Sequence, residues 1–296
     1  MNAGIRPFFP FAAISLVLFL GCGQSKNTGV LESPSRDPVS ETSDFPAVVM
    51  VFLPNGGFCS GTFIGPSTVL TAAHCAKDAG AYRIIAPFGT FTTSHREVLG
   101  TGTVSDANDI ALLILIADAA QARKAQIMPV AGQISLSDTV RLVGYGCNDM
   151  TTSNGGETKR TGTNQIYQLD SFIELLTPNS VTAQSSRGLI GPTNRAGSCF
   201  GDSGGPLLRQ HGTDNYYDVI GVCHAGGPSG SNEVSQYIDI TRADNLKFLT
   251  DTDSRLSLHL FDTCLQPETN CGYQSASMQI VSFLQLIWTK FIALFW

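Results

Sequence analysis

The amino-acid sequence predicts an all-β protein built from two packed six-stranded antiparallel β-barrels with a short C-terminal helix. From about residue 45 to residue 240, short apolar runs alternate with turn segments that contain glycine, proline or asparagine. Only 14% of the residues are charged and glycine occurs 30 times, a composition that suits strands and tight turns better than long solvated helices. A helical spacing of apolar residues first occurs after Ile240.

Residues 1–22 predict an export signal rather than part of the fold. Arg6 precedes an apolar run from Phe8 to Leu20, which ends at Gly21-Cys22. This run is too short to span a membrane comfortably, and its basic start and small terminal residues are typical of a secretory signal peptide. The segment FLGC also resembles the lipobox of bacterial lipoproteins, although Phe19 stands where that motif prefers leucine. We expect the protein to be exported, either with a lipid attached to Cys22 or without one.

Residues 23–44 predict a linker or pro-segment. They are polar, contain proline and serine, and show no periodicity. We therefore expect the folded domain to cover residues 45–250 and a C-terminal extension to cover residues 251–296.

The expected domain holds two series of short strands. The first series reads PAVVMVFL, FCSGTFI, STVLTAAHC, AYRIIAP, REVLGTGT and DIALLILI. The second reads TVRLVGYGC, NQIYQLDSFIELL, SVTAQSS, GPLLRQ, YYDVIGVCHAG and SQYIDI. Two sets of about six strands are what a pair of small antiparallel barrels needs. The helix is expected at TRADNLKFLTD, where an early aspartate precedes apolar residues at helical spacing.

The end of the chain, residues 279–296, is almost wholly apolar. Ser282, Gln285 and Thr289 fall on one helical face, and Lys290 adds a charge near the end. The segment is marginal in length for a membrane span, which favours a helix that lies in the membrane interface. A helix docked on the protein body is the other interpretation.

Charge and cysteine content restrict the partners. A net charge of −6 and a pI near 5.3, with no run of lysine or arginine, argue against nucleic acid. Because export leads to an oxidising compartment, disulfide bonds are the first interpretation of the cysteines after Cys22. Their number is odd, which leaves one thiol over or one bond between chains. No cluster has metal-ligand spacing, so we expect no metal and no cofactor. We expect a monomer.

The segment SCFGDSGGPLL, residues 198–208, contains a candidate nucleophile. Gly201 and Gly204 flank Asp202-Ser203 and permit a tight turn that exposes the Ser203 hydroxyl. The backbone N–H groups of Gly201 and Ser203 can then point at one oxygen, as an oxyanion hole requires.

A nucleophile also needs a base and a group that orients the base. LTAAHC places His74 at the end of an apolar strand, and NDIALLIL places Asp109 at the start of another. Three other histidines, His95, His211 and His259, lie in no such motif, and we expect them on the surface or in loops.

These motifs, in the order His, Asp, Ser, resemble those of the trypsin/chymotrypsin family of serine proteases over about residues 45–250. The resemblance implies that Ser203 attacks the scissile carbonyl, that His74 takes and returns the proton, and that Asp109 orients His74 and stabilises its cation. It also implies an oxyanion hole formed by Gly201 and Ser203. The implied activity is that of a serine endopeptidase, which hydrolyses proteins or peptides through an acyl-enzyme. It would act in the bacterial cell envelope, lipid-anchored or periplasmic, or as a secreted protein.

A second interpretation is a catalytically silent protease-fold protein that binds partners at the cell envelope. The presence of all the catalytic residue types together with the oxyanion glycines favours the enzyme, because inactive relatives typically lack at least one of them.

The sequence departs from the family at the activation site. Family members usually mature by cleavage before an Ile-Val-Gly-Gly stretch, and the freed amine pairs with the aspartate that precedes the nucleophile, here Asp202. No such stretch lies upstream of Phe45. Either Asp202 finds another partner, or cleavage occurs at an unusual site such as Gly29-Val30 or Pro38-Val39.

The resemblance also places the primary specificity pocket. Its floor falls at Gly197, where an aspartate would select lysine or arginine, so we expect no preference for basic residues. The segment GVCHAGG, with His224 and Gly226, would form the strand and wall beside the pocket. His224 stands where the family commonly has serine, and it either meets an acidic substrate residue or only fills volume.

The cysteine pairing is implied only in part. The resemblance pairs Cys59 with Cys75, which staples the loop of the catalytic histidine. Cys199 could bond Cys147 or Cys223, and the sequence leaves this open. Cys264 and Cys271 could close a small loop outside the protease core.

Overall fold

The structure is a computed structural model that describes residues 39–103, 105–117, 134–148, 153–178, 195–211, 216–229, 232–258 and 260. The signal segment with Cys22, His259, the pair Cys264 and Cys271, and the apolar segment 279–296 lie outside these residues. The expectations for them stay predictions.

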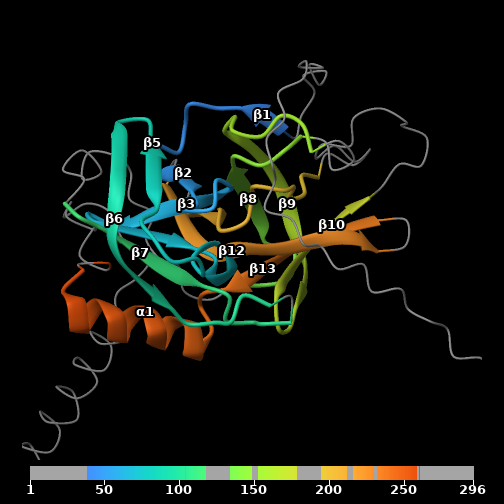
Figure 1. Ribbon diagram of the computed structural model, residues 1–296. Helices are drawn as coiled ribbons and strands as arrows, with labels where there is room; N and C mark the ends of the chain where they lie inside the picture. The colour runs from blue at the N-terminus through green and yellow to red at the C-terminus, as the bar shows by residue number, and fades with distance from the viewer. Residues whose placement is uncertain are drawn as a thin grey trace, which may run out of the picture.

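The first barrel closes in the strand order β2-β3-β4-β7-β6-β5, and every neighbouring pair is antiparallel (Figure 1). Its strands are rich in β-branched and aliphatic residues, and the two central strands β3 and β4 are buried along their whole length. The strands are β2 (Val48–Phe52), β3 (Phe58–Gly65), β4 (Thr68–Thr71), β5 (Arg83–Ala86), β6 (Gly89–Val98) and β7 (Ala111–Leu115).

The second barrel closes in the order β8-β9-β10-β13-β12-β11, because β8 also pairs with β9. Its strands are β8 (Thr139–Gly144), β9 (Arg160–Leu169), β10 (Ile173–Pro178), β11 (Pro206–His211), β12 (Tyr216–Ser229) and β13 (Asn232–Asp239). A short strand, β1 (Val39–Glu41), adds to the outer edge of β9, with Val39 opposite Gly162. Residues 39–41, predicted to belong to the linker, are therefore part of this sheet.

The two closed six-stranded antiparallel barrels and the helix confirm the predicted fold class. One expected strand, NQIYQLDSFIELL, is instead two strands, β9 and β10. The Asp170 carboxylate accepts the N–H of Phe172 at 3.2 Å and fixes the turn between them. The expected strand SVTAQSS lies outside the described residues.

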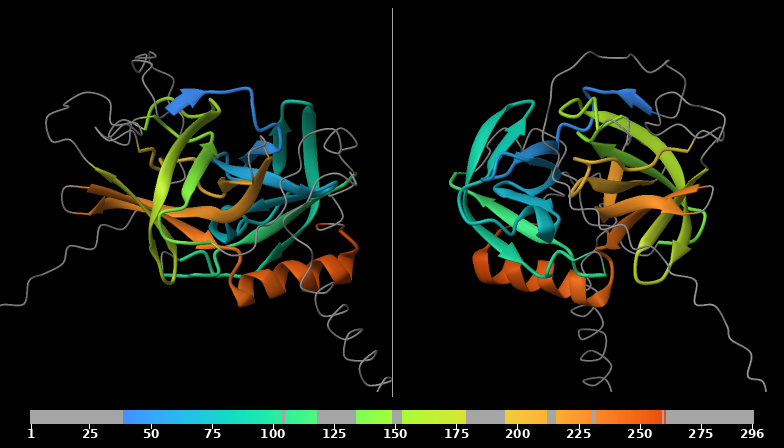
Figure 2. Two further views of the ribbon diagram at one scale, coloured as in Figure 1. Left: turned by 180° about the vertical axis from the view of Figure 1, so that it is seen from behind. Right: turned by 45° about the vertical axis from the view of Figure 1, so that its right-hand side comes forward.

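Helix α1 (Ala243–Leu256) follows the second barrel but packs under the first one (Figure 2). Leu249 is fully buried against the core of the first barrel. Asn245 donates hydrogen bonds from its side-chain amide to the carbonyls of Ala107 and Asp239, at 3.2 and 2.7 Å, and so ties the helix to both barrels. Among the described helices, none has the length and apolar character required to cross a membrane.

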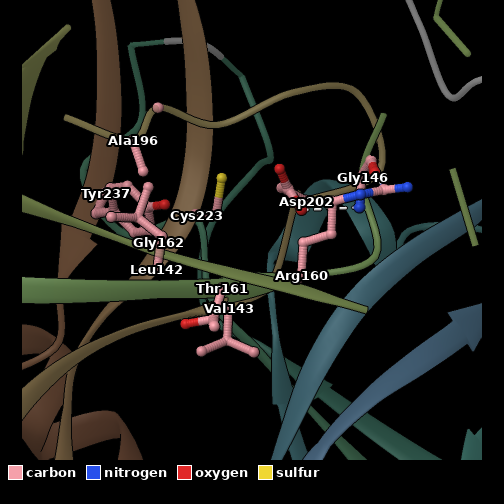
Figure 3. A pocket seen from close by; sticks show the side chains of 12 residues that line it. Leu142, Val143, Gly146, Arg160, Thr161, Gly162, Ala196, Asp202, Cys223 and Tyr237 are labelled. Carbon is pink, nitrogen blue, oxygen red and sulfur yellow. Dashed lines mark hydrogen bonds between the residues drawn. The ribbon is translucent and has the colours of Figure 1, made fainter. Parts of the chain in front are cut away.

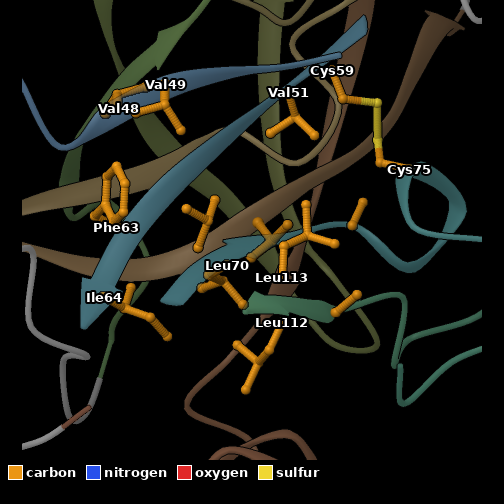
Figure 4. Close-up of a cluster of buried hydrophobic side chains, with 14 of the residues drawn as sticks. Val48, Val49, Val51, Cys59, Phe63, Ile64, Leu70, Cys75, Leu112 and Leu113 are labelled. Atoms are coloured by element: carbon orange, nitrogen blue, oxygen red, sulfur yellow. A yellow bond between two sulfur atoms is a disulfide. The ribbon is translucent and has the colours of Figure 1, made fainter. Parts of the chain in front are cut away.

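The interior of the first barrel is a close-packed apolar cluster (Figure 4). Phe63, Ile64, Leu70, Leu112 and Leu113 are each at most 1% exposed. Burial of one such side chain stabilises the fold by roughly 1.5–3 kcal/mol. This core holds β4 and β7 in register, and two candidate catalytic residues lie just after β4 and just before β7.

Candidate active site

The pairing of β4 with β7 brings His74 and Asp109 together. Thr71, at the end of β4, lies opposite Ala111, at the start of β7. Because the strands are antiparallel, the residues just after β4 and just before β7 leave the barrel at the same edge. The chain after β4 enters a short 3₁₀ turn, Ala73–Cys75, which carries His74.

Two hydrogen bonds connect the pair. Nδ1 of His74 lies 2.7 Å from Oδ2 of Asp109, and the backbone N–H of His74 donates to Oδ1 of Asp109 at 2.8 Å. Asp109 is fully buried. Burial alone would raise the pKa of Asp109, but the hydrogen bonds from His224 and His74 outweigh it and hold the pKa below its ordinary value. Asp109 is therefore a buried anion that orients the His74 ring.

His224 binds the same carboxylate from the second barrel. Its Nδ1 lies 2.5 Å from Oδ2 of Asp109, and the side chain is 1% exposed. Its ring stacks on Phe172, with ring centroids 5.2 Å apart and an angle of 7° between the planes. The register of β12 against β13 shifts between Cys223 and Ala225, so His224 is the extra residue of a β-bulge.

The structure directs the His224 ring at Asp109, and the position of His224 in the wall of the specificity pocket stays a prediction. A buried carboxylate needs hydrogen-bond donors, and the bulge turns the imidazole toward Asp109. From the sequence, the resemblance implied only that His224 stands where the family commonly has serine. The strand register that aims its ring is a tertiary property.

The turn that carries Ser203 packs against the segment that leads to His74. Gly204 has φ +80°, and a Cβ added there would lie 2.1 Å from Oγ1 of Thr71 and 3.0 Å from the backbone nitrogen of Ala72. The Ser203 carbonyl accepts the N–H of Ser60 at 2.8 Å. Among the described residues, the Ser203 hydroxyl forms no hydrogen bond with the His74 ring. Catalytic hydrogen bonds of substrate-free enzymes often tighten only when substrate binds.

Two backbone donors of this turn are left open. The N–H groups of Asp202, Gly204 and Gly205 bond to carbonyls at 2.8–3.0 Å, whereas those of Gly201 and Ser203 bond to no group in the described part of the chain. Gly201 has φ +96°, and a Cβ added there would lie 2.6 Å from Cε2 of Phe58. A larger residue at position 201 would therefore disturb the turn, which offers two adjacent donors to an anionic oxygen.

Hydroxyl groups surround the candidate pocket floor. Gly197 is buried, and a Cβ added there would lie 3.0 Å from Oγ1 of Thr177 and 3.2 Å from Oγ of Ser235. The N–H of Ser198 donates to Oγ of Ser235 at 2.8 Å. A Cβ added at Gly226 would lie 3.0 Å from Oγ of Ser198. The groups nearest to these glycines are therefore polar and uncharged.

Two disulfides brace the site. Cys59 bonds Cys75, the neighbour of His74, as the resemblance implied. Cys147 bonds Cys199, which settles the alternative that the sequence left open. Cys223 is a buried free thiol, and burial raises its pKa.

Within the described part of the chain, potential metal ligands gather at two places, and several of their ligand atoms already form other bonds. His74, Asp109 and His224 offer ligand atoms within 4.8 Å of one another, but both Nδ1 atoms are hydrogen-bonded to Asp109. The other group contains Cys59 and Cys75, whose sulfurs form a disulfide.

The loop before Asp109 is a part of the site that the sequence analysis missed. Gly102 has φ +71°, and a Cβ added there would lie 2.7 Å from Cα of His74. Asp106 accepts hydrogen bonds from the N–H groups of Thr101 and Asn108 and fixes the loop. An aspartate whose carboxylate can accept the N–H two residues further on, as Asp106 does from Asn108, is a sequence signal for such a turn.

Comparisons with known proteins identify the family of the chain. The family model described as Trypsin matches residues 36–246. Neutrophil elastase of Mus musculus is 26% identical over 268 residues, which cover 82% of this chain and 94% of the elastase. Serine protease SP24D of Anopheles gambiae is 26% identical over 227 residues, which cover 68% of this chain and 76% of that protein.

A solved structure of a Glu endopeptidase in complex with MPD has the same fold. It superposes with a TM-score of 0.53 at 16% identity and covers 74% of this chain and 98% of its own. The family model spans most of the chain, over the barrels and the residues described above. The chain therefore belongs to the trypsin family of serine-type endopeptidases.

Proposed function

We propose that the chain hydrolyses peptide bonds with Ser203 as nucleophile, His74 as general base and acid, and Asp109 as the residue that orients His74. The observation that carries this proposal is the His74–Asp109 pair at the edge of β4 and β7, next to a turn with two open backbone donors. Family membership supports the same chemistry.

The geometry suits an acyl-enzyme mechanism. Asp109 holds Nδ1–H of His74, which leaves Nε2 to accept the Ser203 proton as the oxygen attacks the carbonyl carbon. The N–H groups of Gly201 and Ser203 stabilise the oxyanion. His74 then protonates the amine as the C–N bond breaks. Water, deprotonated by the same imidazole, releases the acid product and restores Ser203.

The substrate residue before the scissile bond is proposed to be uncharged rather than lysine or arginine. The groups nearest to Gly197 are the hydroxyls of Thr177 and Ser235. A cationic side chain buried there would lose its hydration without a carboxylate to offset the loss. Recognition of an acidic residue by His224 is not supported, because its imidazole is engaged with Asp109.

We also propose that the protein is exported and acts on proteins or peptides as a monomer. The two disulfides among the described residues are consistent with an oxidising compartment. Lipidation at Cys22 and membrane contact through residues 279–296 remain predictions from the sequence. A Cys22→Ser variant that leaves the membrane fraction would support the first, and deletion of 279–296 tests the second separately.

Hydrolysis of an unstructured protein such as casein tests the proposal against the alternative of a silent binding protein. The wild-type chain should release peptides, and Ser203→Ala should release none while it melts at the same temperature. Equal hydrolysis by both proteins would contradict the assignment of Ser203 as the nucleophile. A folded wild-type protein that hydrolyses no peptide bond would favour the binding protein.

A further inference from the structure

The carboxylate of Asp202, directly before Ser203, is enclosed by backbone. Its Oδ1 accepts the N–H of Gly146 at 2.8 Å, and its Oδ2 accepts the N–H of Cys199 at 2.9 Å. A Cβ added at Gly144 would lie 2.1 Å from Oδ1. Burial raises the pKa of Asp202 to about 6. The ionised carboxylate therefore needs a cation nearby to offset its lost hydration.

Arg160 supplies a cation at the same place. Its Nη1 donates to the carbonyls of Gly146 and Thr158, at 3.1 and 3.3 Å, and to the carbonyl of Gly155. Gly146 thus donates its N–H to Asp202 and its carbonyl accepts from Arg160. Figure 3 shows the two side chains beside Gly146 at one end of a shared pocket.

Arg160 has two acidic neighbours, Glu41 and then Asp202, and the charges of both favour its guanidinium cation. The Arg160 side chain is 11% exposed, so its charge is poorly screened. Glu41 lies 3.7 Å away, but its side chain is 72% exposed and its effect is weakened by water. The pocket that Arg160 and Asp202 line has a volume of about 20 Å³, which is room for one water molecule. The hydrogen bonds from Cys199 and Gly146 and the charge of Arg160 lower the pKa of Asp202, against the larger effect of burial.

We propose that Arg160 is a positioning residue for the catalytic turn: its charge holds the Asp202 carboxylate in place, so that the Ser203 turn and its open donors form in the uncut chain. The family's usual freed amine is then not required. This inference rests on the proposed serine endopeptidase activity, because the turn matters only if Ser203 reacts.

The first test is the reaction of the purified full chain with a fluorophosphonate probe. Intact mass and N-terminal sequence of the labelled species show whether it was cut near residues 29–39. We expect the uncut wild-type chain to label, Arg160→Met to label at least tenfold more slowly, and Arg255→Met to stay within twofold. Arg255 is a matched control, because it pairs with Glu97 at 2.8 Å on the exposed side of α1.

The second test separates the charge of Arg160 from its bonds to the three carbonyls. The Arg160→Met change is made in the wild-type and in the Asp202→Asn background, and urea midpoints are measured for all four proteins. If Arg160 acts through the Asp202 charge, the shift in midpoint caused by Arg160→Met should fall by at least half in Asp202→Asn. If Arg160 only holds the loop through its hydrogen bonds to the three carbonyls, Arg160→Met should shift the urea midpoint equally in both backgrounds.

The outcomes are distinguishable. Labelling of only the cut wild-type chain would overturn the inference and leave the proposed function intact. Equal labelling of wild type and Arg160→Met, or equal midpoint shifts in both backgrounds, would also overturn it. A folded wild-type protein that labels neither uncut nor cut would remove the proposed function itself, and the inference with it.

Discussion

Nδ1 of His224 lies 2.5 Å from Oδ2 of Asp109, the same oxygen that bonds Nδ1 of His74 at 2.7 Å. The buried carboxylate therefore interacts with one imidazole from each barrel. In the family that the sequence resembles, a serine commonly stands at the position equivalent to His224. The substitution by histidine keeps a donor and adds a ring that Phe172 covers.

The donor on His224 should contribute to the rate rather than to substrate binding. His224→Phe preserves a ring for the stack on Phe172 but removes the N–H that satisfies Asp109. We expect kcat to fall roughly 10- to 100-fold, equivalent to about 1.4–2.7 kcal/mol, with KM nearly unchanged. His224→Ser, which restores a hydroxyl donor, should recover most of the loss.

Steady-state kinetics on one peptide substrate would check this, with melting temperatures as the control for folding. If the phenylalanine variant turns over like the wild type, His224 is not a positioning residue for Asp109.

Ser203 and His74 should behave as one unit. Ser203→Ala and His74→Ala should each lower kcat by several orders of magnitude, and the double variant should lose little more, because each change alone already disables the same step. Neither change should unfold the chain, since glycines and the Cys59–Cys75 disulfide set the local backbone. Independent, multiplicative losses would contradict a shared mechanism.

The stability of the protein should decrease as pH rises from about 4 to 6. Burial raises the pKa of Asp202 to about 6, above its ordinary value of 3.8. In this window the folded state keeps a proton that the unfolded state has released, so rising pH favours unfolding, by roughly 3 kcal/mol for this group. Denaturant titrations at several pH values should show this decrease in the wild type and a weaker one in Asp202→Asn. Identical pH dependence in both proteins would contradict the burial argument.

Replacement of Gly197 should show how tightly the pocket floor is packed. A Cβ at this position would lie 3.0 Å from Oγ1 of Thr177 and 3.2 Å from Oγ of Ser235, so Gly197→Asp needs both hydroxyls to move. We expect a lower melting temperature and at most a small gain of turnover on arginine substrates. A cleavage profile on a peptide library should show no preference for lysine or arginine in the wild type. Strong cleavage after basic residues would contradict the assignment of Gly197 to the floor.

Local patterns predicted much of this protein. Short apolar runs separated by turn residues indicated the barrels. The motifs placed His74 after one strand and Asp109 before another, and the β4–β7 register brings these two positions to the same edge. The glycines around Ser203 indicated a turn because they are the residues that accept positive φ.

Other features depend on contacts that the sequence pattern does not encode. A one-residue bulge aims His224 at Asp109, and no local signal distinguishes it from an ordinary strand residue. Arg160 and Asp202 both bond to Gly146 only because β9 and the turn after residue 144 meet in the second barrel. The pairing of Val39 with Gly162 joins segments far apart in the chain.

Site mapping of a fluorophosphonate adduct tests the central claim most directly. Labelled full-length protein is digested, and the modified residue is identified by mass spectrometry. The account predicts a single adduct on Ser203, absent in Ser203→Ala and strongly reduced in His74→Ala. An adduct on another residue, or equal modification of Ser203 when His74 is replaced, would contradict it.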